Sequence, residues 1–265
     1  MKQSSWTILN NEPVAWRTYR MVLQGDTSDI RPGQFVEIQL PNYYLRRPIS
    51  VCDIDADRLT LIYKTVGEGT AAMAAMPAGT ELDILSCLGN GYDLTKAGDE
   101  VLLVGGGVGV PPLIYAAKQL SRVEGQKSKV KVVLGFGSKR EVFGEEAFRA
   151  LGCEVSVCTM DGSYGTKGVV TDLIGQRSTA QQIVWSEAQE RKVEGQKLPF
   201  YYACGPIPML RALVRELGKN GQLSMEERMG CGVGICVGCS IETRSGVKRV
   251  CKEGPVFDAG DIIWK

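Results

Sequence analysis

The sequence predicts a multidomain β and α/β protein with an N-terminal antiparallel β-barrel, a doubly wound parallel α/β domain and a small C-terminal loop/β domain. Three observations predict this: short alternating apolar segments up to about residue 85, strands alternating with helices from residue 99, and an abrupt rise in glycine and cysteine after residue 224. A chain of 265 residues is long enough for two domains and a small third. We place these parts at residues 1–98, 99–222 and 223–265.

The first part consists of short β-like segments. In Gln34–Leu40 every second residue from Val36 onward lies on one apolar face, and Leu59–Lys64 alternates in the same way. Several short strands at this spacing are typical of a small barrel. One helical interruption is expected at residues 70–79, where Thr70 can cap a short helix rich in alanine and methionine.

The second part alternates strands with helices, which predicts a parallel sheet. Its first strand is an uninterrupted apolar run, as expected for a strand covered on both faces. The expected strands are residues 101–107, 130–137, 154–160 and 199–205, and the expected helices are 111–122, 145–150 and 208–217. The polar segment 177–197 is expected to be surface helix and loop.

Composition excludes several classes of function. Lys and Arg total 31 against 30 Asp and Glu, so net charge favours neither nucleic acid nor an acidic membrane. No apolar run is long enough to span a membrane, and the N-terminus does not resemble a signal peptide, so a cytoplasmic location is expected. The chain contains no histidine, which excludes Ser-His-Asp and Cys-His catalysis, histidine-ligated zinc and Rieske-type iron. The chemistry is therefore expected to come mainly from cofactors.

Four of the nine cysteines lie close together near the C-terminus. Cys231, Cys236, Cys239 and Cys251 give the spacing C-x4-C-x2-C followed by one distant cysteine, which is the plant-type [2Fe–2S] arrangement. Interspersed glycines let the backbone fold tightly and direct N–H groups at the sulfurs. A structural zinc site is the alternative, but it usually has two C-x2-C pairs and this segment has one.

A glycine-rich turn follows the first parallel strand. Its glycines are Gly105, Gly106, Gly107 and Gly109, and the prolines after them suit the first turn of a helix. Such a turn presents backbone N–H groups at a helix N-terminus, where a pyrophosphate binds favourably. The spacing differs from G-x-G-x-x-G, and a turn that serves only packing is the alternative.

Three further segments are candidate ligand sites. Cys204–Gly205–Pro206 ends the last parallel strand at the edge where open α/β sheets bind ligands, with Cys204 facing the crevice. Arg46–Ser50 can offer a guanidinium fork to a phosphate and a backbone edge to a flat ring, and Gly69 with Thr70 forms a second anion seat. Taken singly, Cys204–Pro206 can be an ordinary strand–helix connection, Arg46–Ser50 can contain a surface arginine, and Gly69 with Thr70 can be an ordinary helix cap.

These motifs together resemble a known family. "RRPIS", "GEGT", "GGGVGVPPL" and "CGPIPM" occur in the order typical of ferredoxin–NADP reductase-like flavoproteins. With "ERMGCGVGICVGC" and "VCKEGPVF" following, nearly the whole chain resembles the electron-transfer subunits of dihydroorotate dehydrogenase B. Ile49 departs from the wider reductase family, in which many members place a tyrosine beside the flavin.

The resemblance implies three cofactors, namely FAD in the barrel, NAD in the α/β domain and a [2Fe–2S] cluster on the four cysteines named above. The implied FAD contacts are Arg47, Pro48, Ile49, Ser50, Ile62, Tyr63, Lys64, Gly69 and Thr70. The implied NAD contacts are Gly105, Gly106, Gly107, Gly109, Gly205 and Pro206, with Cys204 as the candidate catalytic residue.

The resemblance also implies a partner, an FMN-containing catalytic subunit that oxidises dihydroorotate, in a heterotetramer of two of each chain. Electrons would pass from that FMN through the cluster and FAD to NAD+, in pyrimidine biosynthesis. Two alternatives are a reductase of the same build that feeds a ferredoxin, a sulfur reductase or an oxygenase, and a non-enzymatic iron–sulfur or zinc module. Ser138, Lys139 and Arg140 either meet the 2′-phosphate of NADP or are solvated surface charges.

Overall fold

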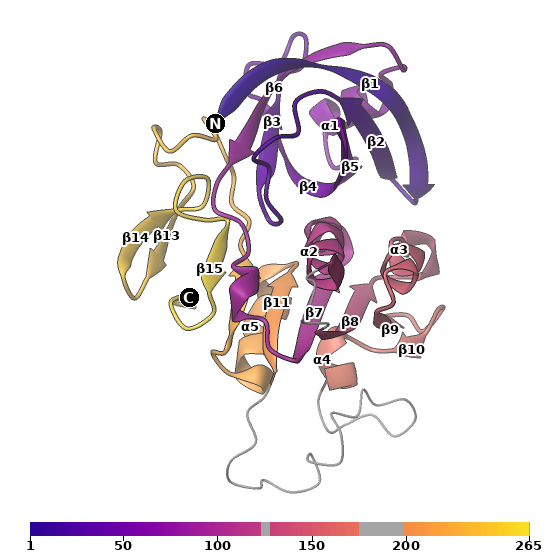
Figure 1. The fold of residues 1–265 in the computed structure, drawn as a ribbon, viewed down its shortest axis with the longest axis vertical. Helices are drawn as coiled ribbons and strands as arrows, with labels where there is room; N and C mark the ends of the chain where they lie inside the picture. The colour runs from indigo at the N-terminus through magenta and orange to yellow at the C-terminus, as the bar shows by residue number, and fades with distance from the viewer. Residues whose placement is uncertain (123–127, 175–198, 265) are drawn as a thin grey trace, which may run out of the picture.

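The computed structural model describes residues 1–122, 128–174 and 199–264 (Figure 1). A barrel lies at one end of the molecule, an open sheet with helices lies at the other, and the C-terminal segment runs along one side of both (Figure 1). No helix among the described residues is long and apolar enough to cross a membrane. The predicted surface segment 177–197 lies outside the described residues.

The N-terminal part is a closed antiparallel barrel with the strand order β1-β2-β5-β4-β3-β6. Its strands are β1 (Lys2–Ala15), β2 (Thr18–Gln24), β3 (Phe35–Ile38), β4 (Arg47–Asp55), β5 (Arg58–Lys64) and β6 (Glu81–Leu88). Fully buried apolar side chains such as Trp6, Met21 and Leu61 fill its interior. The predicted barrel is confirmed, and closure leaves few unpaired strand edges.

The α/β part is a seven-stranded sheet with the order β10-β9-β8-β7-β11-β12-β15. Its strands are β7 (Glu100–Gly106), β8 (Lys129–Phe136), β9 (Glu154–Thr159), β10 (Thr166–Lys167), β11 (Phe200–Cys204), β12 (Gly221–Ser224) and β15 (Val256–Asp258). Its helices are α2 (Pro111–Arg122), α3 (Glu145–Ala150), α4 (Val170–Ile174) and α5 (Ile207–Leu217). Neighbouring strands are parallel except that β15 pairs antiparallel with β12.

The two faces of this sheet contribute to different hydrophobic cores. Leu102 and Val104 of β7 share a core with residues of α4 and α5, whereas Val101 and Leu103 share one with residues of α2 and α3. Alternate side chains of one strand point to opposite faces, so both faces must be apolar. This confirms the predicted doubly wound arrangement.

The C-terminal segment is joined to the rest of the protein. It contains the hairpin β13 (Ser240–Thr243) and β14 (Gly246–Arg249), and its strand β15 extends the large sheet. Cys239 and Cys251 are buried in the same core as Phe35 and Leu88 of the barrel. A segment of this size is too small to form a hydrophobic core of its own, so its apolar side chains pack into a core shared with the barrel and the α/β domain. The domain boundaries at residues 98 and 222 stay predictions.

Two local details go beyond what the sequence pattern indicates. Helix α1 (Glu68–Ala74) begins before Thr70, whose hydroxyl instead accepts hydrogen bonds from the backbone N–H of Val66 and Gly67, at 3.0 and 3.3 Å. Thr70 therefore takes part in the cap from position N3 of a capping box, and the N-cap residue itself is Gly67. All four residues of β3 are buried. Val36 and Ile38 lie in the barrel core, whereas Phe35, on the other face, lies in the core shared with the C-terminal segment.

The barrel and the sheet are held together by specific contacts. The ammonium of Lys118 on α2 lies 2.9 Å from both carboxylate oxygens of Asp53 on β4, and donates to the carbonyl of Ile54 at 2.7 Å. In a second contact, the backbone N–H of Trp16 donates to the carbonyl of Arg140 at 2.8 Å. The Lys118 contacts hold α2, the helix after the glycine turn, against β4, the strand that begins with "RPIS".

Candidate cofactor-binding and electron-transfer site

The first residues of β4 form a half-buried edge. Arg47, Pro48, Ile49 and Ser50 are partly exposed, whereas the next two residues of the strand are buried. The guanidinium of Arg47 lies 4.9 Å from the centre of the Tyr43 ring. It also lies against Gly69, where an added Cβ would be 2.1 Å from Nε of Arg47. The absence of a side chain at Gly69 therefore lets Arg47 pack against the start of α1. The structure thus brings the predicted site residues Arg47 and Gly69 together.

The predicted residues on β5 divide between two environments. Ile62 packs against the core of the α/β domain, and Lys64 pairs with Glu141 at 3.0 Å. Tyr63 is instead inside the barrel, where its hydroxyl donates to Oδ1 of Asn11 at 2.9 Å and burial raises its pKa to about 12. The side chain of Tyr63 thus points into the barrel core, and its backbone is the part that could contact a ligand on the face next to the α/β domain.

The two glycine turns of the α/β domain interlock at the carboxyl edge of the sheet. The turn η2 (Gly107–Gly109) follows β7 and contacts β5 of the barrel. A Cβ on Gly109 would lie 2.2 Å from the carbonyl oxygen of Cys204, and one on Gly205 would lie 3.1 Å from the backbone nitrogen of Gly106. The structure therefore brings the predicted Gly105–Gly109 and Cys204–Pro206 segments side by side, next to the barrel.

Cys204 is half-buried at the end of β11. Burial raises the pKa of its thiol to about 12, a hydrogen bond with Ser224 opposes the shift, and the charge of Glu226 adds to it. The side chain is therefore a neutral thiol near pH 7. It suits contact with a ligand ring and does not suit thiolate chemistry.

The loop containing Cys231, Cys236 and Cys239 points backbone donors at sulfur. The N–H groups of Ile235 and Cys236 donate to Sγ of Cys231 at 3.3 and 3.4 Å, and the N–H of Cys251 donates to Sγ of Cys239 at 3.4 Å. Burial disfavours the Cys231 thiolate, but the N–H donors outweigh it and hold the pKa of Cys231 at about 6. For Cys251, burial and the neighbouring cysteines raise the pKa to about 12.

Side-chain contacts pair Cys231 with Cys236, and Cys239 with Cys251. Among the described residues, no three cysteine or carboxylate side chains lie close enough together to form a complete metal site. The donor set still fits an iron–sulfur cluster, because it offers four thiols, backbone N–H groups aimed at sulfur and glycines with room for a close approach.

Sequence reasoning missed Glu37 on β3. This side chain is 1% exposed, and neither carboxylate oxygen has a hydrogen-bond partner. Burial raises its pKa to about 7, the charge of Arg46 opposes the shift and that of Cys231 adds to it. The signal was a single acidic residue inside an otherwise apolar strand.

Sequence reasoning also missed Trp16, on the β1–β2 turn. Three cations surround its indole ring: Arg140, Lys64 and Arg17 lie 4.0, 5.2 and 5.6 Å from the ring centre. Arg140 belongs to η3 (Lys139–Glu141), directly after β8. The only signal in the sequence was a tryptophan directly before a basic residue, Arg17.

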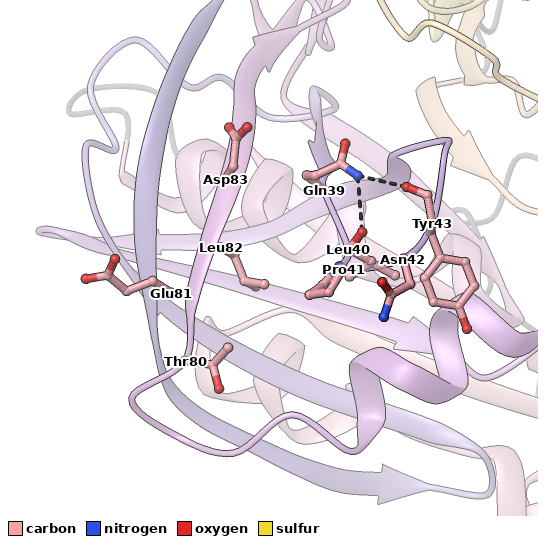
Figure 2. A pocket seen from close by; sticks show the side chains of 9 residues that line it. All are labelled: Gln39, Leu40, Pro41, Asn42, Tyr43, Thr80, Glu81, Leu82 and Asp83. Atoms are coloured by element: carbon pink, nitrogen blue, oxygen red, sulfur yellow. Dashed lines mark hydrogen bonds between the residues drawn. The ribbon is translucent and has the colours of Figure 1, made fainter.

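A shallow hollow of about 570 Å³ lies on the barrel surface, lined by residues 39–43 and 80–83 (Figure 2). Within it the amide of Gln39 donates to the carbonyls of Leu40 and Tyr43, at 3.1 and 2.9 Å (Figure 2). None of the predicted site residues lines this hollow. It is therefore distinct from the predicted ligand sites on β4, β5 and the two glycine turns.

Comparison with known proteins identifies the family. Residues 226–263 match the model for the iron–sulfur cluster binding domain of dihydroorotate dehydrogenase B. The chain is 42% identical over 273 residues to the dihydroorotate dehydrogenase B (NAD(+)) electron transfer subunit of Fusobacterium nucleatum, covering 99% of each chain. It is 43% identical over 270 residues to that of Bacillus caldolyticus, covering 97% of each chain.

Solved structures agree with this fold. The structure of an NADH-dependent reduced ferredoxin-NADP oxidoreductase matches with a TM-score of 0.80 and 28% identity, over 97% of this chain and 89% of the other. A ferredoxin NADP+ reductase from Neisseria gonorrhoeae matches with a TM-score of 0.66 and 16% identity, over 86% of this chain and 95% of the other. Identity over full length, the cluster-domain match and the shared fold lead to one conclusion: the chain belongs to the family of electron transfer subunits of NAD-dependent dihydroorotate dehydrogenase B.

Proposed function

We propose that this chain passes electrons from the FMN of a dihydroorotate-oxidising partner subunit to NAD+, using a [2Fe–2S] cluster and an FAD that it holds. The observation that carries the proposal is the shared core, in which Cys239 and Cys251 pack with Phe35 and Leu88 of the barrel. This packing keeps the cysteine loop beside the proposed flavin site. A bound flavin supplies the conversion between two-electron hydride exchange with nicotinamide and one-electron exchange with an iron–sulfur cluster.

The proposed FAD site lies along the half-buried edge of β4. Arg47 would pair with the pyrophosphate, because its guanidinium is a planar fork of donors. The backbone of Pro48, Ile49 and Ser50, with Ile62 and Tyr63 on β5, would border the flavin ring. Lys64, Gly69 and Thr70 complete the proposed contacts. The flavin ring would then lie between the barrel and η2, since β5 contacts η2.

The proposed NAD site is the pair of interlocked glycine turns. Gly105, Gly106, Gly107 and Gly109 would let the dinucleotide approach the backbone, while Gly205 and Pro206 would close the opposite side. The neutral thiol of Cys204 would contact the nicotinamide and help to hold it parallel to the flavin. Open α/β sheets bind nucleotides at this edge, which supports the placement.

The four cysteines Cys231, Cys236, Cys239 and Cys251 would ligate the cluster. Two neighbouring apolar side chains support a partner docking on this side, because Ile235 and Val237 are 82% and 60% exposed on the cysteine loop. Exposed apolar residues next to a redox centre suit a stable interface. We propose a heterotetramer with two FMN-containing subunits, and a cytoplasmic location, which the nine free cysteines favour.

Anaerobic reconstitution tests the function. The purified chain, mixed with the dihydroorotate-oxidising subunit, dihydroorotate and NAD+, is expected to produce orotate and NADH in equal amounts. Neither subunit alone should do so. NADH titration of this chain alone should bleach flavin and cluster absorption together. Colourless protein without iron or flavin would refute the proposal, and bleaching without orotate-linked NADH formation would favour a different electron partner.

Replacing Gly69 with alanine is expected to lower FAD binding about tenfold or more. The new Cβ would lie 2.1 Å from Nε and 2.6 Å from Nη2 of Arg47, so the guanidinium must leave its position. A charged hydrogen-bonded pair is worth about 1.5–3 kcal/mol, which sets the magnitude. The measurement is FAD content and dissociation constant by absorbance, with Gly98→Ala, where an added Cβ meets nothing within 4 Å, as the control.

Replacing Trp16 with alanine is expected to weaken the preference for NADH over NADPH about tenfold. In the structure Arg140 is stacked on Trp16 and Glu141 is paired with Lys64, so both turn toward the barrel. Freed from the indole, Arg140 could pair with a 2′-phosphate, a gain on the order of 1.5 kcal/mol. The measurement is kcat/KM with each nucleotide. Trp16→Phe, which keeps a ring for the guanidinium, should retain the original preference.

A further inference from the structure

The carboxyl of Glu37 is the most unusual buried polar group in the described residues. It lies on β3 with 1% exposure, and both of its oxygens lack hydrogen-bond partners. Buried polar groups in native proteins are nearly always satisfied, so each exception calls for an explanation. A carboxyl serving only the barrel core would be better replaced by an apolar side chain.

The carboxyl is directed at the cysteine loop. A Cβ built on Gly232 would lie 2.2 Å from Oε1 of Glu37, 2.6 Å from Cγ and 2.7 Å from Cδ. Gly232 also has a φ of +67°, a conformation that glycine adopts readily. The residue next to the proposed ligand Cys231 is therefore seated directly on the Glu37 side chain, with no room for any other side chain.

Neighbouring cations do not account for the carboxyl. Arg46 directs Nη2 to Oδ2 of Asp83 at 2.6 Å and Nη1 to the backbone carbonyl of Asp83 at 2.9 Å. Arg47 donates to the carbonyl of Leu45 and lies over the ring of Tyr43. Both arginines contribute charge near Glu37, and Nη1 of Arg46 also donates to the backbone carbonyl of Glu37 at 3.4 Å, but neither arginine donates to the carboxylate. The carboxyl is left facing the backbone of the loop.

The position of Glu37 in the barrel links it to the proposed flavin site. In the antiparallel register of β3 and β4, Glu37 pairs with Pro48, and Val36 pairs with Ile49. One residue thus lies beside the strand proposed to border FAD and also against the loop proposed to hold the cluster. Because β3 is paired on both sides within a closed barrel, this contact is held by rigid structure.

We propose that Glu37 is a positioning residue that holds the cysteine loop against the barrel beside β4, the strand proposed to border FAD. It thereby sets the position of the cluster relative to FAD, and this inference rests on the cofactor sites proposed above. The contact between its carboxyl and Gly232 acts as a fixed stop for the loop. Glu37 itself touches neither the reacting atoms nor the substrate. Its effect should appear in electron transfer between the two cofactors and in the environment of the cluster.

A double-mutant cycle on the full chain with its cofactors tests this role. The variants are Glu37→Gln, Glu37→Ala, Gly232→Ala and the pair Glu37→Ala with Gly232→Ala. The exposed Glu81→Ala on the same barrel is the control. For each we would measure iron, sulfide and FAD per chain, the electron paramagnetic resonance spectrum of the reduced cluster, and the separate rates of flavin and cluster reduction after mixing with NADH.

Glu37→Ala is expected to slow flavin-to-cluster transfer about tenfold and alter the cluster spectrum, while flavin reduction by NADH stays unchanged. Glu37→Gln keeps the shape of the side chain and should stay within about twofold of the original rate. Gly232→Ala alone should lose cluster. Adding Glu37→Ala should recover part of that loss, because the methyl group gains the vacated space, and the two effects are then non-additive.

Three outcomes would count against these assignments. Iron-loaded Glu37→Ala protein with an unchanged spectrum and transfer rate would overturn the role of Glu37 alone. Additive effects of the two substitutions would show that the contact does not act as a stop. Absence of iron from the unaltered protein would overturn the proposed cluster itself, and with it this role. Should Glu37→Ala not fold, Glu37→Thr, which suits a strand, replaces it in the cycle.

Discussion

Replacing Cys236 with alanine is expected to abolish orotate-linked NADH formation while leaving the flavin in place. Cys236 is exposed on its loop, so losing the side chain should cost little folding stability. Loss of an outer-shell partner already costs about 10–100-fold in metal affinity or activity, and loss of a direct ligand should exceed about 100-fold. The measurement is iron and sulfide content together with the rate of the reconstituted complex.

A second activity separates cluster loss from general damage. With the proposed FAD in place, electrons from NADH would reach an artificial dye without the cluster, so this reaction should stay within about twofold of the original rate in Cys236→Ala. The control is Cys153→Ala, a cysteine outside the loop that should retain iron and both activities. Full iron content in Cys236→Ala would show that another group completes the ligand set, and would remove Cys236 from it.

Local features of the structure could be predicted from the sequence. The cysteine spacing, the glycine turn after β7 and the alternation in β5 each lie within a short stretch of chain, where geometry follows residue order. The predicted helix at residues 111–122 has the same bounds as α2. In these cases the local pattern and the tertiary structure favour the same conformation, so reading the pattern was sufficient.

Contacts between distant segments could not be predicted. The proposed role of Glu37 depends on its contact with Gly232, which is almost 200 residues away in the sequence, so β3 alone gives no sign of it. Alternation in β3 indicates one buried face, and the second became buried because the C-terminal segment shares a core with Phe35. Trp16 and Arg140 likewise meet across two parts of the fold. The alternation of apolar residues in one sequence indicates that one face of a strand is buried. It does not show whether another segment of the chain covers the opposite face.

Replacing Gly109 with alanine is expected to raise the KM for NADH about 100-fold with little change in FAD or iron content. The new Cβ would lie 2.2 Å from the carbonyl oxygen and 2.4 Å from the carbonyl carbon of Cys204, and 2.6 Å from the backbone nitrogen of Gly205. All three atoms are backbone, so no side chain can rotate away to relieve the clash. The two turns must separate, and a misplacement of about 1 Å at a reactive site can cost about 100-fold.

Gly98→Ala is the matched control, because an added Cβ there meets nothing within 4 Å. Thermal unfolding of both variants shows whether the effect is local. If the Gly109 variant keeps its flavin absorption and melting temperature but needs far more NADH for half-maximal reduction, the interlocked turns form the nucleotide site. An unchanged KM in folded Gly109→Ala protein would place the nicotinamide elsewhere, because these backbone segments cannot keep their present contact once a methyl group stands between them.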